Sequence, residues 1–378
     1  MATTLLTGAT GTVGSSLASL LKKKGHQLVY LVRPKDGQNA KDRLVDNSFV
    51  LEGDITRPHL GINVQERRKW KKKIDKILNC AASIKLDGGF SETTSQVNIE
   101  GVRNLLQFAE ELKIPEFHQV STVYVSGSAD YFSEEDFDIG QTSRNHYEQT
   151  KREAEQLVRA WKYGRYSIYR LGIVVGAYNN GYIPTFNGYY VFASSLWHLR
   201  NTLLGKNEQE MKRYEREGVS LDLDRMLTLP IYLNFAPNST LNIIPVDWAS
   251  DIVSELVAVP AKRKVFHIVH PSPRRARWVN DVSLKHLGIK GFYYGDFADF
   301  SSRSLLGRLQ KIYNRSTLQY IPYITHESRF EVANAPYVLG ERYRLPPEID
   351  EIFIVTILDY AKSVDFGRRK QKIKAVEA

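Results

Sequence analysis

The sequence predicts an α/β protein built on a doubly wound parallel sheet, with a smaller region of mixed character toward its C-terminal end. Through the first half of the 378 residues, short apolar and β-branched runs alternate with helical patterns, which is typical of parallel strands joined by crossover helices. After residue 172 this alternation stops, and residues 176–240 form a long aromatic and polar stretch of mixed helix and loop character. These two observations indicate a sheet-based domain followed by a second, less regular region.

Strands and helices alternate regularly up to residue 171. The predicted strands are 3–7, 27–33, 48–53, 76–81, 117–122 and 167–171. The predicted helices are 13–24, 66–72, 93–112 and 144–162. Two later apolar runs, 241–245 and 264–270, flank a predicted helix over 247–257, and we expect both runs to return to the first sheet. The expected division is a domain over 1–175 and a second region over 176–378, in which about 241–270 rejoins the first domain.

Composition limits the class of protein. With 42% apolar and 25% charged residues, the chain is an ordinary globular protein of enzyme size. Its one cysteine, Cys80, excludes a disulfide framework, and the apolar run from Leu5 leaves no room for a targeting leader, so we expect a cytoplasmic protein. No window reaches the roughly 20 apolar residues that cross a bilayer, so any membrane contact would be peripheral. The net charge of +10 favours acidic or phosphorylated partners without choosing among them.

Three glycines mark the first turn of the predicted sheet. Gly8, Gly11 and Gly14 follow the first strand and open the first helix, so backbone amides at the start of the helix can face an anion that no side chain blocks. The spacing differs from the GxGxxG fingerprint of dinucleotide-binding proteins, and a tight turn alone would also explain it. Its position at the first strand-to-helix turn favours a site for a pyrophosphate.

The end of the second strand indicates which dinucleotide fits this site. A carboxylate at this point binds the 2′-hydroxyl of an adenosine ribose, whereas an arginine suits a 2′-phosphate. Here the strand ends at Arg33, and Lys35 and Arg43 follow. The nearest acid, Asp36, lies three residues past the strand. The sequence therefore predicts NADP rather than NAD, and the alternative is that Arg33 is only a solvated side chain.

A tyrosine and a lysine, Tyr147 and Lys151, are candidates for proton transfer. Of the 21 tyrosines, only Tyr147 is followed four residues later by a lysine, which places both side chains on one face of a helix. A phenol with the usual pKa of about 10 is a poor proton donor near neutral pH, but an adjacent ammonium lowers that pKa. The same spacing also arises by chance, so a second feature is needed.

The segment HQVSTVYVSG, at the carboxyl end of the fifth predicted strand, supplies that feature. In an open parallel sheet ligands bind at this edge, so Ser121 or Thr122 can offer a hydroxyl to the oxygen that Tyr147 protonates. Because neighbouring strand residues point to opposite faces, only one of the two can face the site. The residues alone leave that choice open.

The segments TGATGTVG, STVYVSG and YEQTK together resemble the extended short-chain dehydrogenases/reductases. Within them the chain is most similar to the thioester reductase branch, which includes fatty acyl-CoA reductases and the reductase domains of carboxylic acid reductases and peptide synthetases. The narrower resemblance is carried by LEGDITRPHLGI, ILNCAASIKLDGGF, VNIEGVRNLLQFA, YRLGIVVGAYNNGYIPTFNGYY, LNIIPVDWASDIV and FHIVHPSP. It spans about residues 4–275 and implies a Rossmann fold for the first domain, whereas the final residues match only loosely.

The resemblance implies a role for each matching residue. The pyrophosphate turn would comprise Gly8, Thr10, Gly11, Thr12, Val13 and Gly14. The other cofactor contacts would be Arg33 and Arg43 at the 2′-phosphate, Asp54 and Ile55 at the adenine, Ala81 and Ala82 at the ribose, Gly172 and Ile173 at the nicotinamide, and the helix residues Asn98, Tyr147 and Lys151. Thr122 rather than Ser121 takes the catalytic hydroxyl position, with Tyr147 as the acid and Lys151 as its electrostatic support. Leu171 stands where many relatives carry proline, which leaves the shape of the nicotinamide pocket open.

The implied function is NADPH-dependent reduction of an acyl thioester to an aldehyde, with the acyl group on coenzyme A or on an acyl carrier protein. A second hydride would give an alcohol. Two alternatives stay open. Another extended short-chain enzyme, such as a sugar-nucleotide epimerase or a hydroxysteroid dehydrogenase, would share the core motifs. A non-catalytic dinucleotide-binding module is the other, although such modules usually lack the tyrosine or the lysine.

Several other features are predicted to be structural. Cys80 lies in an apolar strand and is interpreted as a small buried hydrophobe rather than a nucleophile. The nine histidines show no paired ligand spacing, so no metal site is predicted. The basic runs ERRKWKKK and RRKQK lack the fold context of nucleic-acid binding and are interpreted as solvated. Six aromatic residues either line an acyl pocket or form the core of the second region: Tyr182, Phe186, Tyr189, Tyr190, Phe192 and Trp197.

Overall fold

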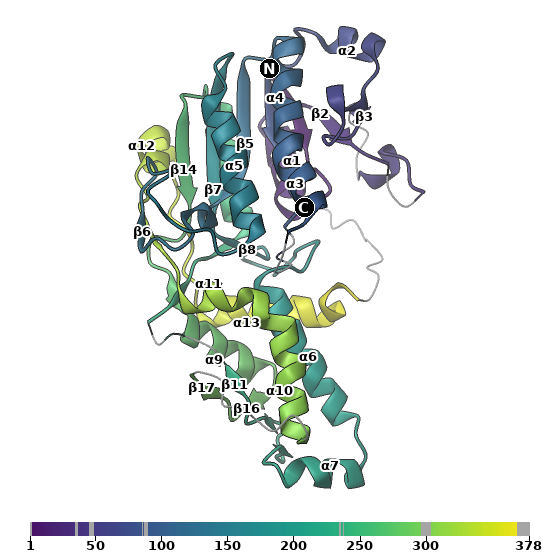
Figure 1. Ribbon diagram of the computed structural model, residues 1–378, viewed down its shortest axis with the longest axis vertical. Coiled ribbons are helices and arrows are strands. Elements are labelled where there is room, and N and C mark those ends of the chain that lie inside the picture. Colours follow the sequence, from purple (N-terminus) through teal and green to yellow (C-terminus); the bar gives the residue numbers. More distant parts are fainter. Residues whose placement is uncertain are drawn as a thin grey trace. The chain divides into compact units, whose positions relative to one another are not determined.

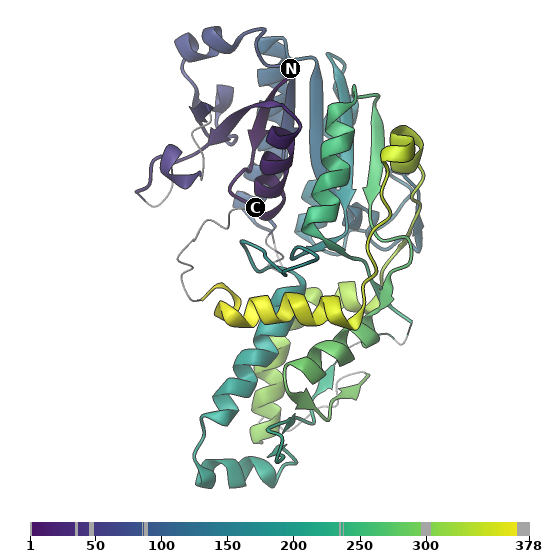
Figure 2. The same cartoon turned by 180° about the vertical axis from the view of Figure 1, so that it is seen from behind.

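The computed structural model describes residues 2–34, 37–44, 49–84, 86, 90–233, 236, 238–295 and 304–368. The chain divides into two compact units (Figures 1 and 2). The first unit comprises Met1–Val174, Ile244–Pro271 and Ser328–Pro347, and the second comprises Val175–Ile243, Ser272–Glu327 and Glu348–Ala378. The chain therefore leaves the first unit and returns to it twice. The assignment of one part to the cofactor and the other to the substrate stays a prediction.

A seven-stranded sheet forms the core of the first unit. Its strands are β1 (Thr3–Thr7), β2 (Gln27–Val32), β3 (Phe49–Glu52), β4 (Lys76–Asn79), β5 (Glu116–Thr122), β7 (Arg165–Leu171) and β14 (Lys264–Ile268). They lie in the order β14, β7, β5, β4, β1, β2, β3, and every neighbouring pair is parallel. The order reverses between β1 and β4, and in such sheets ligands bind at the carboxyl ends of the strands beside this point. The predicted doubly wound parallel sheet is confirmed.

Helices cover both faces of the sheet. Those of the first unit are α1 (Thr12–Lys23), α2 (Val64–Trp70), α3 (Glu92–Ser95), α4 (Gly101–Leu112), α5 (His146–Ala160), α8 (Val246–Ala258) and α12 (Asn334–Leu339). Phe108 of α4 and Val158 of α5 belong to one buried cluster, whereas Leu17 of α1 and Ile252 of α8 belong to another. Figure 1 shows α4 and α5 in front of the strands, and Figure 2 shows the dark purple α1 and the green α8 on the opposite face.

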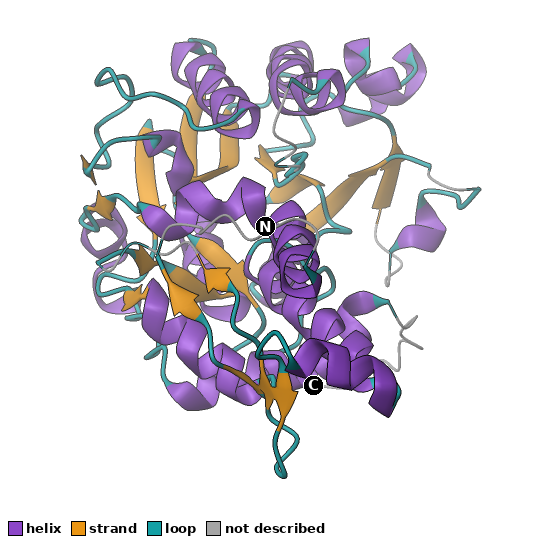
Figure 3. Cartoon of the chain, turned by 60° about the horizontal axis from the view of Figure 1, so that its bottom comes forward, coloured by secondary structure: helices purple, strands orange, loops and turns teal. Residues whose placement is uncertain are grey.

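The second unit contains more helix than strand. Figure 3 shows the helices in purple and the strands in orange over the whole described chain. Its helices are α6 (Tyr189–Leu204), α7 (Glu208–Glu215), α9 (Ala276–His286), α10 (Leu305–Thr317), α11 (Ile321–Thr325) and α13 (Glu351–Ser363). The strands β9 (Ser220–Leu221), β10 (Leu227–Thr228) and β16 (Ile289–Lys290) pair in one small sheet, and β11 (Tyr232–Leu233) and β17 (Tyr293–Tyr294) pair in another. Of the six aromatic residues, Tyr189, Tyr190 and Phe192 are buried in this unit, which supports the core interpretation for these three.

The two later runs expected in the sheet behave differently. Residues 264–268 join it as β14, at the edge beside β7. The expectation for 241–245 is wrong, because this run breaks at Asn242 into β12 (Thr240–Leu241), which pairs with β15 (Arg274–Arg275), and β13 (Ile243–Pro245), which also lies outside the sheet. Glu327 explains the break, since its carboxylate accepts hydrogen bonds from Thr240 Oγ1 at 2.6 Å and from the Asn242 amide at 2.7 Å.

Three further features complete the described chain. The predicted helix 93–112 is divided into α3, a π-helical turn (Gln96–Glu100) and α4. Strand β8 (Ile173–Val175) follows β7, and β18 (Arg329–Phe330) pairs in parallel with β6 (Tyr131–Phe132). Within the described ranges, none of the helices combines the length and the apolar character that crossing a bilayer requires.

Candidate functional site

The turn between β1 and α1 requires glycine at two positions. Gly8 has a φ of +71°, and a Cβ atom there would lie 2.6 Å from the Cys80 carbonyl carbon. A Cβ atom on Gly14 would lie 2.1 Å from the Gly8 carbonyl oxygen, so the first turn of α1 packs directly on the end of β1. The Gly11 amide closes the turn by donating to the Gly8 carbonyl at 2.9 Å. This close packing leaves the amino end of α1 open to a ligand.

A cavity of about 240 Å³ lies against this turn, at the carboxyl ends of β1, β2 and β4. Its lining includes many of the predicted cofactor residues, namely Gly8, Thr10, Gly11, Arg33, Arg43, Asp54, Ile55, Ala81 and Ala82. The other predicted residues of the turn, Thr12, Val13 and Gly14, form the first turn of α1 and are not part of the lining. The residues predicted to bind the adenosine and some of those predicted to bind the pyrophosphate therefore line one cavity.

Two arginines and one carboxylate meet at the wall of the cavity. Arg43 donates from Nη1 to the Arg33 carbonyl oxygen at 2.5 Å, and its Nη2 lies 3.4 Å from Thr10 Oγ1. The Arg33 side chain is 53% exposed, and its Nη1 lies 3.9 Å from Asp54 Oδ2. The other oxygen of Asp54 accepts from the amide and the hydroxyl of Thr56, at 2.9 and 2.8 Å. A phosphate near Arg33 would therefore find a guanidinium that is still accessible. Lys35 and Asp36 lie outside the described residues.

Some residues of the cavity were not predicted: Thr7, Ala9, Leu31, Val32, Gly53, Cys80 and Val97. Most of them lie at or just past the carboxyl end of a strand, which is the signal that could have identified them. Thr7 also holds the cavity wall in place, because its hydroxyl donates to Asn79 Oδ1 at 2.5 Å and accepts from the Ala81 amide at 3.2 Å.

Cys80 faces this cavity, but its thiol is not activated. Burial raises the pKa of Cys80 to about 12, and the charge of Lys151 opposes this only in part. The thiol is therefore protonated at neutral pH, which argues against a role as nucleophile. Among the residues that the structure describes, no three His, Cys, Asp or Glu side chains gather as metal ligands would.

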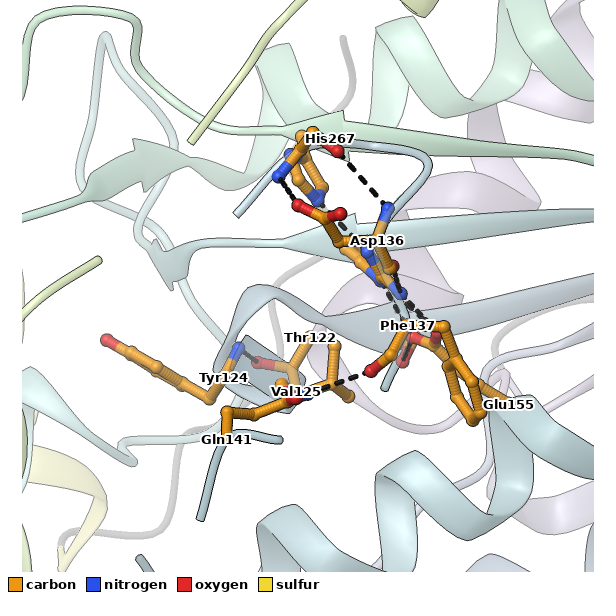
Figure 4. Close-up of polar contacts among 11 residues, drawn as sticks. Thr122, Tyr124, Val125, Asp136, Phe137, Gln141, Glu155 and His267 are labelled. Carbon is orange, nitrogen blue, oxygen red and sulfur yellow. Dashed lines mark hydrogen bonds and ion pairs between the residues drawn. The ribbon is translucent and has the colours of Figure 1, made fainter. Parts of the chain in front are cut away.

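The structure distinguishes the hydroxyls of Ser121 and Thr122, between which the sequence alone did not decide. Thr122 is hydrogen-bonded to the Tyr147 side chain. Its Oγ1 also accepts from the Tyr124 amide at 3.3 Å (Figure 4). Ser121 points away and donates to Glu155 Oε1 at 2.6 Å. Thr122, at the carboxyl end of β5, is thus the hydroxyl that accompanies Tyr147, as the family pattern implies. Its catalytic role stays a prediction.

The electrostatics of Tyr147 and Lys151 differ from the expectation. Burial raises the pKa of the Tyr147 phenol, the hydrogen bond from Thr122 opposes this rise, and Glu148 adds to it. Burial lowers the pKa of Lys151 to about 8 against the opposing charges of Glu155 and Cys80. The expected lowering of the Tyr147 pKa by Lys151 is therefore wrong for this structure. The Lys151 ammonium is engaged elsewhere, since Nζ donates to the Val120 carbonyl at 2.9 Å.

Asn98 lies in the π-helical turn and connects two parts of the site. Its Nδ2 donates to the Ser83 carbonyl and to Thr150 Oγ1, both at 3.0 Å, and its Oδ1 accepts from the Ser83 amide at 2.8 Å. The Thr150 hydroxyl in turn donates to the Tyr147 carbonyl at 2.8 Å. Asn98 thereby links the loop after β4 to the helix that carries Tyr147. Single π-helical turns occur frequently at functional sites.

The remaining predicted residues lie beyond the cavity. Gly172 follows β7 and donates its amide to the Ile268 carbonyl at 3.1 Å, and Ile173 begins β8. Both are half-buried. Like Asn98, Thr122, Tyr147 and Lys151, neither residue lines the cavity, so their predicted contact with the nicotinamide end of a cofactor stays a prediction.

Comparisons with known proteins agree with this arrangement. The family model of the male sterility proteins matches residues 6–253. A dTDP-D-glucose 4,6-dehydratase of Dictyostelium discoideum is 30% identical over 198 residues, which are 48% of this chain and 44% of that protein. Fatty acyl-CoA reductase 1 of Gallus gallus is 29% identical over 143 residues, which are 32% of this chain and 28% of that protein. The chain thus matches less than half the length of these two curated relatives.

A solved structure shows the same fold over almost the whole chain. The terminal R domain from the myxalamid PKS-NRPS biosynthetic pathway has a TM-score of 0.72 at 23% identity, and the alignment covers 98% of this chain and 93% of that chain. At this identity the likeness establishes the fold alone. Because the family model covers well over half of the chain, the chain belongs to the male sterility protein family, and its resemblance to the thioester reductase branch of the extended short-chain dehydrogenases/reductases is confirmed.

Proposed function

We propose that the protein is an NADPH-dependent reductase of an acyl thioester, carried on coenzyme A or on an acyl carrier protein, and that it forms an aldehyde. The observation that carries this proposal is the group formed by Thr122, Tyr147 and Lys151, in a chain whose family and curated relatives include a fatty acyl-CoA reductase. No disulfide or metal chemistry enters the proposal. A cytoplasmic location is part of it.

The roles follow from the chemistry of each side chain. NADPH would supply the hydride to the thioester carbonyl carbon. The developing oxyanion would be met by the hydroxyls of Thr122 and Tyr147, and the raised pKa of Tyr147 keeps its proton in place until the substrate takes it. Lys151 would stabilise the phenolate left behind. The resulting hemithioacetal would then break its carbon–sulfur bond, releasing an aldehyde and a free thiol.

NADP is proposed over NAD because of the cations at the cavity wall. Arg33 is half exposed beside the cavity, and Arg43 is tied to both Arg33 and the glycine turn. A guanidinium pairs well with a phosphate, and both arginines line the cavity. Asp54, at 3.9 Å from Arg33, is the group that such a phosphate would have to displace.

A second function is favoured by one observation. The match to the dTDP-D-glucose 4,6-dehydratase covers 48% of this chain at 30% identity, which keeps a sugar-nucleotide reaction in consideration. Such an enzyme would use the same tyrosine and lysine but would release no thiol. The substrate, rather than the cofactor, therefore separates the two functions.

The test is a comparison of substrate classes with the purified protein. Acyl-CoA and acyl-carrier thioesters would be incubated with NADPH, and both NADPH oxidation and free thiol would be measured. In parallel, dTDP-glucose would be incubated with NAD and with NADP and its product analysed. Thiol release coupled to NADPH oxidation supports the proposed function, whereas conversion of dTDP-glucose alone supports the second.

A further inference from the structure

Glu155 forms a buried ion pair directly behind the candidate catalytic residues. It lies on α5, one turn after Lys151 and two turns after Tyr147, and its side chain is fully buried. Arg170 of β7, also fully buried, donates from Nη2 to Glu155 Oε2 at 2.8 Å, and its Nε lies 3.1 and 3.2 Å from the two carboxylate oxygens. Such a pair is costly to bury unless its hydrogen bonds are satisfied.

The outer side of Arg170 is satisfied as well. Its Nη2 donates to the Asp136 carbonyl at 2.9 Å, and its Nη1 lies 3.3 Å from His267 Nε2 (Figure 4). Burial lowers the pKa of His267 to about 3, so this ring is a neutral acceptor. The guanidinium also lies 4.9 Å from the centre of the Phe132 ring. Arg170 is therefore held from several sides and gives Glu155 a fixed partner.

Glu155 completes a series of contacts between α5 and the end of β5. Tyr147 is hydrogen-bonded to Thr122, Lys151 Nζ donates to the Val120 carbonyl, and Glu155 accepts from the Ser121 hydroxyl. Three neighbouring residues at the end of the strand thus contact three successive turns of the helix. Ser121 is therefore bound to Glu155, and the Thr122 hydroxyl is the one that contacts Tyr147.

The charge of Glu155 also acts on Lys151. The groups that act on the Lys151 ammonium are Glu155 on its own helix, the Val120 carbonyl of β5, and Cys80 after β4. Tyr147 and Cys80 are protonated at neutral pH, since burial raises both of their pKa values. Within the described part of the chain, Glu155 is thus the anion that opposes the loss of charge from buried Lys151.

We propose that Glu155 is a positioning residue for the reaction, whose pair with Arg170 sets the register of α5 on β5 and whose charge keeps Lys151 protonated beside Tyr147. This inference rests on the proposed function, because the reaction supplies the need for a charged lysine. Neither Glu155 nor Arg170 lines the cavity at the glycine turn, where the adenosine and the pyrophosphate of the cofactor are predicted to bind.

The experiment compares the wild type with Glu155→Gln, which keeps the shape and removes the charge. Lys151 is charged below its pKa of about 8 and loses its charge as the pH rises through that value, so kcat/KM should fall on the alkaline side. Removing a nearby opposite charge lowers the pKa of a lysine, typically by about one unit or more. We expect the midpoint of the alkaline fall in kcat/KM to move to lower pH by about one unit, with kcat reduced about tenfold above that midpoint.

Two further variants separate positioning from stability. The double variant Glu155→Gln/Arg170→Met also removes the buried charge of the arginine. Its Tm should therefore be higher than that of Glu155→Gln, while its kcat/KM should still fall at a lower pH than in the wild type. If Glu155→Gln fails to fold, the ionisation of Lys151 can be measured in this double variant instead. Glu116→Gln is the matched control. Glu116 lies at the opposite end of β5, is nearly buried, and pairs with Lys76 at 3.4 Å and Arg165 at 2.9 Å. Removing its charge should lower the Tm without moving the pH at which kcat/KM falls.

A titration that needs no substrate keeps this inference separate from the proposed function. The ionisation of Lys151 would be followed by NMR in lysine-labelled protein, with Lys151→Met to assign the signal. A lower midpoint in both Glu155 variants supports the inference. The same midpoint in the wild type and in the variants overturns it, whatever reaction the protein catalyses. If the wild type reduces no thioester, the proposed function fails while the NMR titration still decides the electrostatic role of Glu155.

Discussion

At the scale of single residues, the environment of Tyr147 determines what the phenol can do. Its pKa is raised by burial, so the hydroxyl is protonated throughout the physiological range, which suits a proton donor. Lys151 does not change this in the free protein, because its ammonium donates to the Val120 carbonyl. Under the proposed function, the charge that develops on the substrate would draw the proton from Tyr147, and Lys151 would act on the phenolate that remains.

Tyr147→Phe tests this role directly. The variant should bind NADPH almost normally and lose about 10²–10³-fold in kcat, because a contact made only in the transition state is removed. Steady-state kinetics and fluorescence titration with NADPH measure the two quantities. Tyr163→Phe, at a half-exposed tyrosine after the same helix, is the control and should behave as the wild type. Wild-type turnover in Tyr147→Phe would remove the tyrosine from the mechanism.

Arg33→Asp tests the choice of cofactor. A carboxylate at this position repels a 2′-phosphate and can accept from a 2′-hydroxyl, so the preference for NADPH over NADH should narrow or invert. The ratio of kcat/KM values for the two cofactors measures it. Arg68→Asp, on the exposed part of α2, changes the net charge equally and should leave the ratio unaltered. A wild type that already prefers NADH contradicts the assignment.

At the scale of elements, the packing of α1 on β1 is the most demanding contact of the cofactor site. The missing Cβ of Gly14 lets the helix start directly above the Gly8 carbonyl. Helix and strand together present the turn to the cavity, so a change in their separation would alter the site without altering any polar group.

Gly14→Ala should therefore cost both stability and cofactor binding. Its Cβ would lie 2.1 Å from a backbone oxygen, which cannot move as a side chain can, and overpacking of this kind costs about 1–3 kcal/mol. Chemical unfolding and NADPH titration measure the two losses. Gly205→Ala is the matched control, because its nearest neighbours would be 3.6 Å away and its φ is negative. Equal behaviour of the two variants would contradict the packing argument.

The elements also show what a sequence can reveal about this fold. Short apolar runs located the strands of the first unit, which are buried on both faces, and helical periodicity located most of its helices. It did not reveal the π-helical turn around Asn98, since one extra residue in a turn barely disturbs a helical pattern. Nor did it reveal that 241–245 leaves the sheet, because this depends on Glu327, which is remote in sequence. The pair of Glu155 with Arg170 escaped for the same reason.

At the scale of the whole molecule, the charge of +10 should influence how the substrate arrives. A coenzyme A thioester or an acidic carrier protein would be attracted over a distance that salt limits to about 10 Å at about 0.1 M. We expect kcat/KM for such a substrate to fall as salt rises, while kcat changes little. A short neutral thioester is the control and should show no dependence. An equal response of both substrates would show that the charge plays no part in recognition.

The central claim, thioester reduction, is tested most directly by measuring NADPH oxidation and free thiol in the same reaction. The account predicts that the purified protein releases thiol from an acyl-CoA or acyl-carrier thioester in step with NADPH oxidation, and that Tyr147→Phe does neither. Sugar-nucleotide conversion without thiol release from any thioester of the panel would contradict the account.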